Sequence, residues 1–525
     1  MGKGNKGKGK GKASPGDGNQ KSLRSAIEAA VNEAVKIQDS ARDLAPAESA
    51  AALETAAQRY REELMRLPGH AEAAYNLATC LSEQADLKDN TREKVLLLRE
   101  SRATLESVIA ADPSGRGATT ALAHHALGNV VCGLVEVFRD HCPTTTADAS
   151  AVSCADCCVP CPSGAECKQE LSRACRHLET AASITERLQN QAGEIEEILV
   201  HLGDAFASMM HMAMDGASAG RSMSGHAPPP DAVQEALALC SNACGKYSEA
   251  LSTATSSGGS DTDILRLKAG AVVNFLDWAL PEAPLPQQLL SGVLFSPDEL
   301  LATGEQAVGV LLGLDSNNVG GLLAKGDLCR LRAREWMLST SGAGMQEEGS
   351  HREESMAWFA RAVQSFPQDS EALTAAGEGL LEYGRRSMTV YEEAAMSAQG
   401  AYGSTALSTR HLEGMRMSAV SRLQEAGSLL SRASSIDTSD TDSPYNAACA
   451  FALSGDAASC FHTLTEFCRR LTATIAAPDV SSRKREAARW SLREASGDVD
   501  LEDVRGAEWF VGLLSSTDAA LVEGA

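Results

Sequence analysis

The sequence predicts an all-α fold, an α-solenoid built from antiparallel helix pairs. Apolar residues make up 43% of the 525 residues but aromatic residues only 4%, a balance that favours close helix packing over a sheet. Alternation of apolar and polar residues with a period of two does not persist beyond a few positions. The third observation is a recurring pair that ends in Gly or Ala and is followed three positions later by a large apolar or thiol residue.

This small-residue signature occurs seven times along the chain. Its members are Leu77-Ala78…Leu81, Leu127-Gly128…Val131, Leu202-Gly203…Phe206, Ala269-Gly270…Val273, Lys325-Gly326…Cys329, Ala376-Gly377…Leu380 and Ala447-Ala448…Phe451. Gly or Ala lets neighbouring helices approach closely, and a larger side chain fills the gap. We therefore expect about seven to eight helical hairpins that each contact their neighbours, with long insertions between helices.

The chain begins with a segment of different composition. Residues 1–20 carry five lysines among glycines, so they bury too little apolar surface to offset their ordering entropy, and we expect a disordered tail. From Lys21 apolar residues recur at helical spacing, as at Ile27 and Val31. The next helix covers 47–67 and ends before a Pro-Gly pair.

The same periodicity and the same turn signals define the remaining helices. We expect them at 70–85, 92–111, 118–139, 166–190, 194–214, 231–254, 261–280, 297–314, 318–338, 351–366, 370–397, 408–436, 444–454 and 457–475. The repeat array then covers 21–480, and helices in 481–525 cap it. Inside the array we expect a cysteine-rich insertion at 140–165 and surface loops at 217–230, 281–296 and 339–350.

Charge and targeting signals limit the compartment and the partners. The net charge is −23, which a solvated helical surface explains; the alternative is a face that recruits a basic protein. No stretch approaches about 18 uninterrupted apolar residues, so we expect no membrane span. The beginning of the chain lacks the apolar core of a signal peptide. We expect a cytoplasmic or nuclear protein with mostly reduced thiols.

The segment at 140–175 concentrates cysteine. Two Cys-x-x-Cys pairs have the spacing with which thiolates grip one zinc ion, but they are adjacent rather than about 12–20 residues apart, which excludes a zinc ribbon. A single ion remains sterically conceivable; its ligands would be Cys154, Cys157, Cys161 and Cys167. A redox-labile or disulfide-bearing loop is one alternative, and a thiol-rich insertion without a dedicated role is another. We expect no bound cofactor.

Patterns typical of catalytic sites are missing from the sequence. It contains no Ser-His-Asp order, no glycine loop that cradles phosphate after a strand, and no His-Glu-x-x-His helix. We therefore expect a protein that is not an enzyme.

The helix pairs resemble the tetratricopeptide repeat. Phe359, Ala362 and Pro367 match that family's positions 24, 27 and 32, with Ser355 in place of the alanine at 20. Residues 314–318, Leu-Asp-Ser-Asn-Asn, resemble its Leu-Asp-Pro-Asn-Asn turn. Successive signatures lie 50, 75, 67, 56, 51 and 71 residues apart, against the family's 34, so the repeats are interrupted. The resemblance covers roughly 48–515 and implies a right-handed superhelix; a helical-hairpin solenoid of another family is the alternative.

The resemblance also implies where a partner lies, namely on the concave surface formed by the first helices, chiefly at positions 5, 9 and 12. We carry these family positions over to this sequence and add Asn76, an asparagine at position 6. The resulting candidate partner-binding residues are Tyr75, Asn76, His125, Asn129, Asp204, Asn274, Asp327, Arg330, Glu378 and Tyr445. The lysines with which chaperone-binding members hold a terminal carboxylate are missing, which disfavours that clamp. The lining is neutral to mildly acidic and suits an apolar or basic peptide.

Three functions follow from these observations. The first is a scaffold or adaptor that binds a peptide segment of a protein partner in the groove. The second is an acidic chaperone for histones or other basic proteins. The third is a thiol- or zinc-dependent sensor that acts through the cysteine-rich insertion. Nucleic acid is expected to make only weak contact, through the lysine-rich tail.

Overall fold

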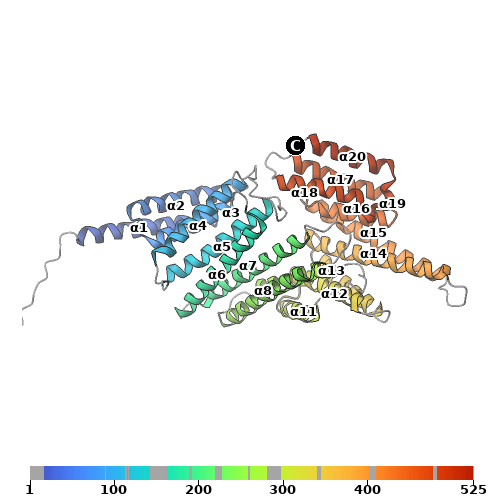
Figure 1. The fold of residues 1–525 in the computed structure, drawn as a ribbon, viewed down its shortest axis with the longest axis horizontal. Coiled ribbons are helices and arrows are strands. Elements are labelled where there is room, and N and C mark those ends of the chain that lie inside the picture. Colours follow the sequence, from blue (N-terminus) through green and yellow to red (C-terminus); the bar gives the residue numbers. More distant parts are fainter. Residues whose placement is uncertain are drawn as a thin grey trace, which may run out of the picture. The chain divides into compact units, whose positions relative to one another are not determined.

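The computed structural model describes residues 17–88, 90–112, 115, 117–141, 162–188, 192–218, 228–257, 261–280, 297–339, 345–400, 409–476 and 482–523. Over these residues every regular element is helical, which confirms the predicted all-α class (Figure 1). Contacts divide the chain into two compact units. The first is Met1–Val137 with Arg176–Gln189, the second is Phe138–Cys175 with Asn190–Ala525, and each is described by itself.

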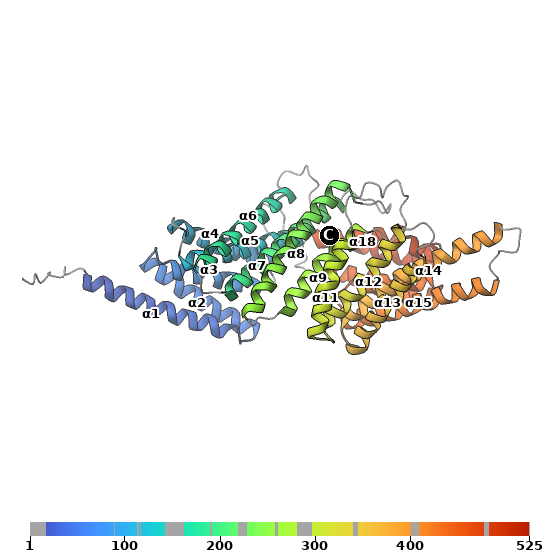
Figure 2. The ribbon, with the colours of Figure 1, turned by 90° about the horizontal axis from the view of Figure 1, so that it is seen from below.

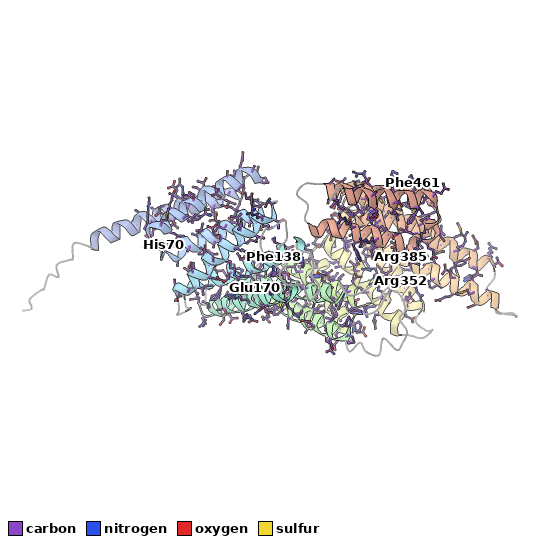
Figure 3. The ribbon with its side chains drawn as sticks, turned by 45° about the horizontal axis from the view of Figure 1, so that its top comes forward. His70, Phe138, Glu170, Arg352, Arg385 and Phe461 are labelled. Carbon is purple, nitrogen blue, oxygen red and sulfur yellow. The ribbon has the colours of Figure 1, made fainter. Side chains whose placement is uncertain are left out.

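The first unit contains α1 (Asp17–Ala41), α2 (Pro46–Arg66), α3 (Ala71–Asp86), α4 (Thr91–Ala111), most of α5 (Ala118–His141) and the second half of α6 (Gly164–Arg187). Local signals fix the helix starts. Pro46 opens α2, where its missing N–H costs nothing. His70, labelled in Figure 3, caps α3, because its Nδ1 accepts the Ala73 N–H at 3.1 Å. Ile27, Leu53 and Leu81 lie in the buried core.

The second unit is also built from consecutive helices. After the first half of α6 it contains α7 (Ala192–Ser218), α8 (Pro230–Ser257), α9 (Asp261–Ala279), α11 (Pro297–Leu314), α12 (Val319–Ser339), α13 (Met345–Ser365), α14 (Ser370–Gly400), α15 (Thr409–Ile436), α16 (Asp442–Leu453), α17 (Ala457–Ala476), α18 (Ser482–Gly497), the 3₁₀ helix η1 (Val499–Leu501), α19 (Glu502–Arg505) and α20 (Glu508–Glu523).

Helices in this unit pack in a regular order. From α7 to α17 each described helix packs on the next one, as Figure 2 shows for α14 and α15, which lie side by side. The first helices of successive pairs also touch: α7 contacts α9, α9 contacts α12, α12 contacts α14, and α14 contacts α16. Contacts restricted to neighbouring hairpins are the defining property of an α-solenoid, so the predicted solenoid class is confirmed.

The small-residue signatures lie on the first helix of each pair and make its closest contacts. A Cβ added to Gly326 would lie 2.5 Å from the ring of Phe359, and one added to Gly203 would lie 2.5 Å from Tyr247. Ser355 adds a buried hydrogen bond from its hydroxyl to the Gly326 carbonyl at 2.8 Å. Gly270 differs, because a Cβ there would meet nothing within 4 Å. Glycine is therefore required sterically at some signatures only.

Several boundaries differ from the sequence prediction. Helix α13 begins at Met345, so the last part of the expected loop 339–350 is helical. The added turns are held by Glu348, whose carboxylate accepts hydrogen bonds from Arg352 at 3.1 Å and Arg386 at 3.0 Å. Helix α1 begins at Asp17, inside the expected tail. In the expected capping region 481–525, Gly506 separates α19 from α20.

One described helix is long and apolar enough to cross a membrane by length and composition, Ala118–Arg139 in α5. Of its apolar window, 56% is buried inside the structure. A core helix passes the same test, so this segment is weak evidence for a span.

Candidate functional site

Three of the carried-over residues come together on the face that α12 and α14 share with α9 and α16. Arg330 joins three of these helices. Its Nη2 lies 3.0 Å from Asp277 Oδ1 of α9 and 2.9 Å from Asp327 Oδ1 of α12. Its Nη1 lies 2.9 Å from Glu382 Oε2 of α14. The predicted Asp327, Arg330 and Glu378 thus belong to one surface, which we call the acidic face.

A buried ion network lies beneath the acidic face. Arg334, one turn after Arg330, donates from Nε to Glu382 Oε1 at 3.0 Å and from Nη2 to Oε2 at 2.6 Å. Arg352 of α13, labelled in Figure 3, donates from Nη1 to Oε1 of the same carboxylate at 3.1 Å. These three bonds converge on one carboxylate and fix α12, α13 and α14 to one another.

The network determines the ionisation of Glu382. Burial alone would raise the pKa of this carboxyl group, but the hydrogen bonds from Arg334 and the charges of Arg334, Arg330 and Arg352 outweigh burial and lower the pKa far below its usual range. Glu382 is therefore an anion at physiological pH. The arginines supply the compensation that a buried charge requires.

Glu378 lies one turn before Glu382 and has the opposite character. Loss of solvent between the helices raises its pKa to about 7, and the charges of Asp327 and Asp442 add to this rise, while Arg330 opposes it. The side chain itself is exposed at the surface. Asn446 of α16 donates from Nδ2 to Glu378 Oε1 at 3.0 Å. Near neutral pH Glu378 is thus only partly ionised.

The acidic face has an excess of carboxylates. It presents four of them. The two guanidinium groups that pair with them, Arg330 with Asp277 and Asp327 and Arg334 with Asp277 at 3.1 Å, are both also shared with Glu382. The four are Asp277, Asp327, Glu378 and Asp442. Burial also raises the pKa of Asp327 and of Asp442. Carboxylates whose ionised form is disfavoured in this way are stabilised by an incoming cation.

Other carried-over residues lie on the first helices but outside the acidic face. Asp204 of α7 accepts the Tyr247 hydroxyl at 2.7 Å, and burial raises its pKa while that hydrogen bond opposes the rise. Tyr445 of α16 donates its hydroxyl to Asp498. Asn274 is exposed on α9. Asp204 and Tyr445 thus hold neighbouring helices together.

The remaining carried-over residues belong to the first unit. Asn129 and His125 lie one turn apart on α5, with 3.4 Å between Nδ2 and Nε2. Tyr75 and Asn76 are half-buried on α3. The first unit therefore brings together one pair of predicted residues.

The structure describes only one of the four candidate zinc ligands. Cys154, Cys157 and Cys161 lie outside the described residues. Cys167 lies in α6, where burial raises the pKa of its thiol to about 11. A thiol that retains its proton at neutral pH is a weak metal ligand and a slow nucleophile.

Sequence reasoning missed the residues beneath the face. Arg334 follows Arg330 by four positions and Glu382 follows Glu378 by four, so both continue the predicted face by one helical turn. Extending each first helix by a turn would have found them. Arg352 could not be found in this way, because it lies on α13, the second helix of its pair.

No protein-family model and no curated protein matches this sequence. One similar solved structure is described as a circular tandem repeat protein with novel repeat topology and enhanced subunit contact surfaces; it is 14% identical with a TM-score of 0.31, over 96% of this chain and 98% of that chain. Another is a human IFIT1 dimer with m7Gppp-AAAA, 12% identical with a TM-score of 0.25, over 82% of this chain and 86% of that chain. At these scores the likenesses carry no functional argument, and the helical-repeat fold rests on the packing described above.

Proposed function

We propose that the chain is a non-catalytic, tetratricopeptide-like scaffold that binds a basic segment of a partner protein on the acidic face. The close contacts of Gly326 with Phe359 and of Gly203 with Tyr247 support the family resemblance, because they join the small and large residues that the repeat pattern pairs. The first helices α9, α12, α14 and α16 supply the face, as this family's mode of peptide binding requires.

The observation that carries the proposal is the crowding of Glu378. Burial raises its pKa, and Arg330, which already pairs with Asp277 and Asp327, offsets that rise only in part. A lysine or arginine side chain placed against Glu378 and Asp327 supplies further positive charge and makes charge-assisted hydrogen bonds. The rigid helices hold these carboxylates in place before the peptide arrives, which limits the entropy lost on binding.

Fluorescence anisotropy with labelled nonapeptide pools tests the proposal. Each pool fixes one position as Lys, Arg, Glu or Leu. We expect the Lys and Arg pools to bind the wild type more tightly than the Glu pool, and Glu378→Gln to weaken that binding about tenfold, the effect of one charge pair. Glu425→Gln, an exposed carboxylate of α15, makes the same charge change away from the face and should bind as the wild type.

Equal binding of basic and acidic pools by the wild type would overturn the proposal. A chaperone for histones or other basic proteins is the second candidate, since the net charge of −23 extends over the whole chain. Binding spread over that surface should collapse at moderate salt and be equally insensitive to Glu378→Gln and Glu425→Gln. Loss of binding specific to Glu378→Gln supports the scaffold.

A further inference from the structure

The second unit contains a pocket whose charge is opposite to that of the acidic face. It is an open pocket of about 720 Å³ lined by α13, α14 and α15. Its charged lining consists of Arg352, Arg386, Arg410 and Arg422 with the single carboxylate of Glu348. This volume falls in the range of roughly 300–1,000 Å³ that accommodates small organic ligands.

Arg352, which lines the pocket, carries one buried donor without a partner. Arg352 is 3% exposed, and its Nη2 has no hydrogen-bond partner among the described residues. Its other nitrogens are engaged: Nε with Glu348 Oε1 at 3.1 Å and Nη1 with Glu382 Oε1 at 3.1 Å. A buried guanidinium N–H without an acceptor is costly, and a ligand acceptor in the pocket removes that cost.

Two further guanidinium groups are held in position by their neighbours. Arg386 donates from Nε to Glu348 Oε1 at 3.0 Å. The Arg422 guanidinium carbon lies 4.1 Å from the centre of the Tyr383 ring, and its Nη2 lies 3.2 Å from Glu353 Oε1. Arg410 is exposed at the start of α15 and forms no ion pair with a described residue.

The charge balance favours an anion. Four arginines line the pocket, and three glutamates neutralise part of their charge: Glu348 in the lining, and Glu382 and Glu353 outside it. A positive excess remains, in a chain whose net charge is −23. Glu348 already places one carboxylate between Arg352 and Arg386, as its hydrogen bonds to both show. The remaining donors suit a group with more than two oxygens and more than one charge.

We propose that this pocket binds a phosphomonoester, with Arg352 Nη2, Arg410 and Arg422 as donors to the phosphoryl oxygens. Guanidinium forks match phosphate oxygens in pairs, and a phosphoryl dianion carries three of them. Val390 and Met415 line the same pocket and offer apolar contact to the organic part of the ester. The pocket and the acidic face are different surfaces, so this site does not depend on the basic-peptide proposal.

Isothermal titration of the full chain tests the site with inorganic phosphate, O-phosphoserine, a phosphoserine peptide and the same peptide with glutamate. We expect both phosphoserine probes to bind, and Arg410→Gln to weaken them about tenfold. The control is Arg416→Gln, which changes the same charge on α15, where Arg416 Nη2 pairs with Glu413 at 2.9 Å. Its affinity should equal that of the wild type. Thermal melting should be unchanged for Arg410→Gln, because Arg410 has no ion pair with a described residue to lose.

The probes also separate the sources of the phosphoryl group. Equal affinity for O-phosphoserine and the phosphopeptide identifies a free metabolite, and tighter binding of the phosphopeptide identifies a modified protein segment. Either result supports the site. Failure of both phosphoserine probes to bind, equal binding of the glutamate peptide, or equal losses in Arg410→Gln and Arg416→Gln would overturn it.

Discussion

Arg334 and Glu382 form two parallel hydrogen bonds, Nε to Oε1 at 3.0 Å and Nη2 to Oε2 at 2.6 Å, and both side chains are almost completely buried. Arg334 also donates from Nη1 to the Leu280 carbonyl at 3.1 Å. The pair therefore connects the end of α9 with α12 and α14. Because Glu382 also accepts from Arg330 and Arg352, one carboxylate stabilises both the acidic face and the arginine pocket.

Glu382→Gln should destabilise the second unit by about 3–5 kcal/mol, because the buried Arg334 and Arg352 both lose the anion that they share. Denaturant unfolding measures the loss. Glu392→Gln, an exposed carboxylate on the same helix, should change the stability by no more than about 0.5 kcal/mol. The lowered pKa of Glu382 means that its contribution is present above its unfolded pKa of about 4.3 and is lost as pH falls through the folded value. Equal effects of the two substitutions would contradict the network's role.

Gly326→Ala should cost about 1–3 kcal/mol, because the new Cβ would lie 2.5 Å from the Phe359 ring, which is rigid and buried. The matched control is Gly270→Ala, at the same place in another signature, where a Cβ meets nothing within 4 Å. That change should stabilise the helix by up to about 1 kcal/mol, since alanine is the better helix former. Unfolding midpoints of the two variants should therefore shift in opposite directions, and shifts of the same sign would show that the contact is not tight.

Glu378→Gln should stabilise the second unit in a pH-dependent manner. The folded pKa of about 7 exceeds the unfolded value of about 4.3, so the ionised form is disfavoured in the fold. This penalty is absent below about pH 4, grows as pH rises and is complete above the folded pKa. The unfolding midpoint of Glu378→Gln should exceed that of the wild type at about pH 8 and match it at about pH 4. A midpoint difference that does not vary with pH would exclude a raised pKa.

Tyr247→Phe and Tyr60→Phe each remove a tyrosine hydroxyl from the second helix of a pair. The two changes should lower the free energy of unfolding by different amounts. Tyr247 donates to the carboxylate of Asp204 at 2.7 Å, whereas Tyr60 donates to the neutral Gln38 Oε1 at 3.0 Å. We expect losses of about 1.5–3 kcal/mol and about 1 kcal/mol respectively at neutral pH. In acid the first loss should shrink as Asp204 takes up a proton, and the second should not change. Parallel pH profiles in denaturant unfolding would contradict this assignment.

The local sequence pattern was sufficient to predict the helices and part of the acidic face. Ile27 and Val31 mark a buried stripe by spacing alone, and the signature glycines locate the first helix of each pair. Asp327, Arg330 and Glu378 could be placed on one surface, because equivalent positions of first helices point the same way. The start of α13 at Met345 could not be predicted from periodicity, because polar contacts of Glu348, and no apolar stripe, hold its first turns.

The sequence by itself determined that this protein is an all-α stack of hairpins. Helical periodicity, turn residues and glycine spacing are local signals over a few positions, so they can be recognised without knowing which segments pack together. Only the tertiary structure decided that Arg334, Arg352 and Glu382 share one network and that four arginines from three helices surround one pocket. Arg334 and Arg352 lie 48 and 30 residues from Glu382 along the chain. Their charges interact with it only after the packing of apolar faces has set the distance and the solvent around each pair.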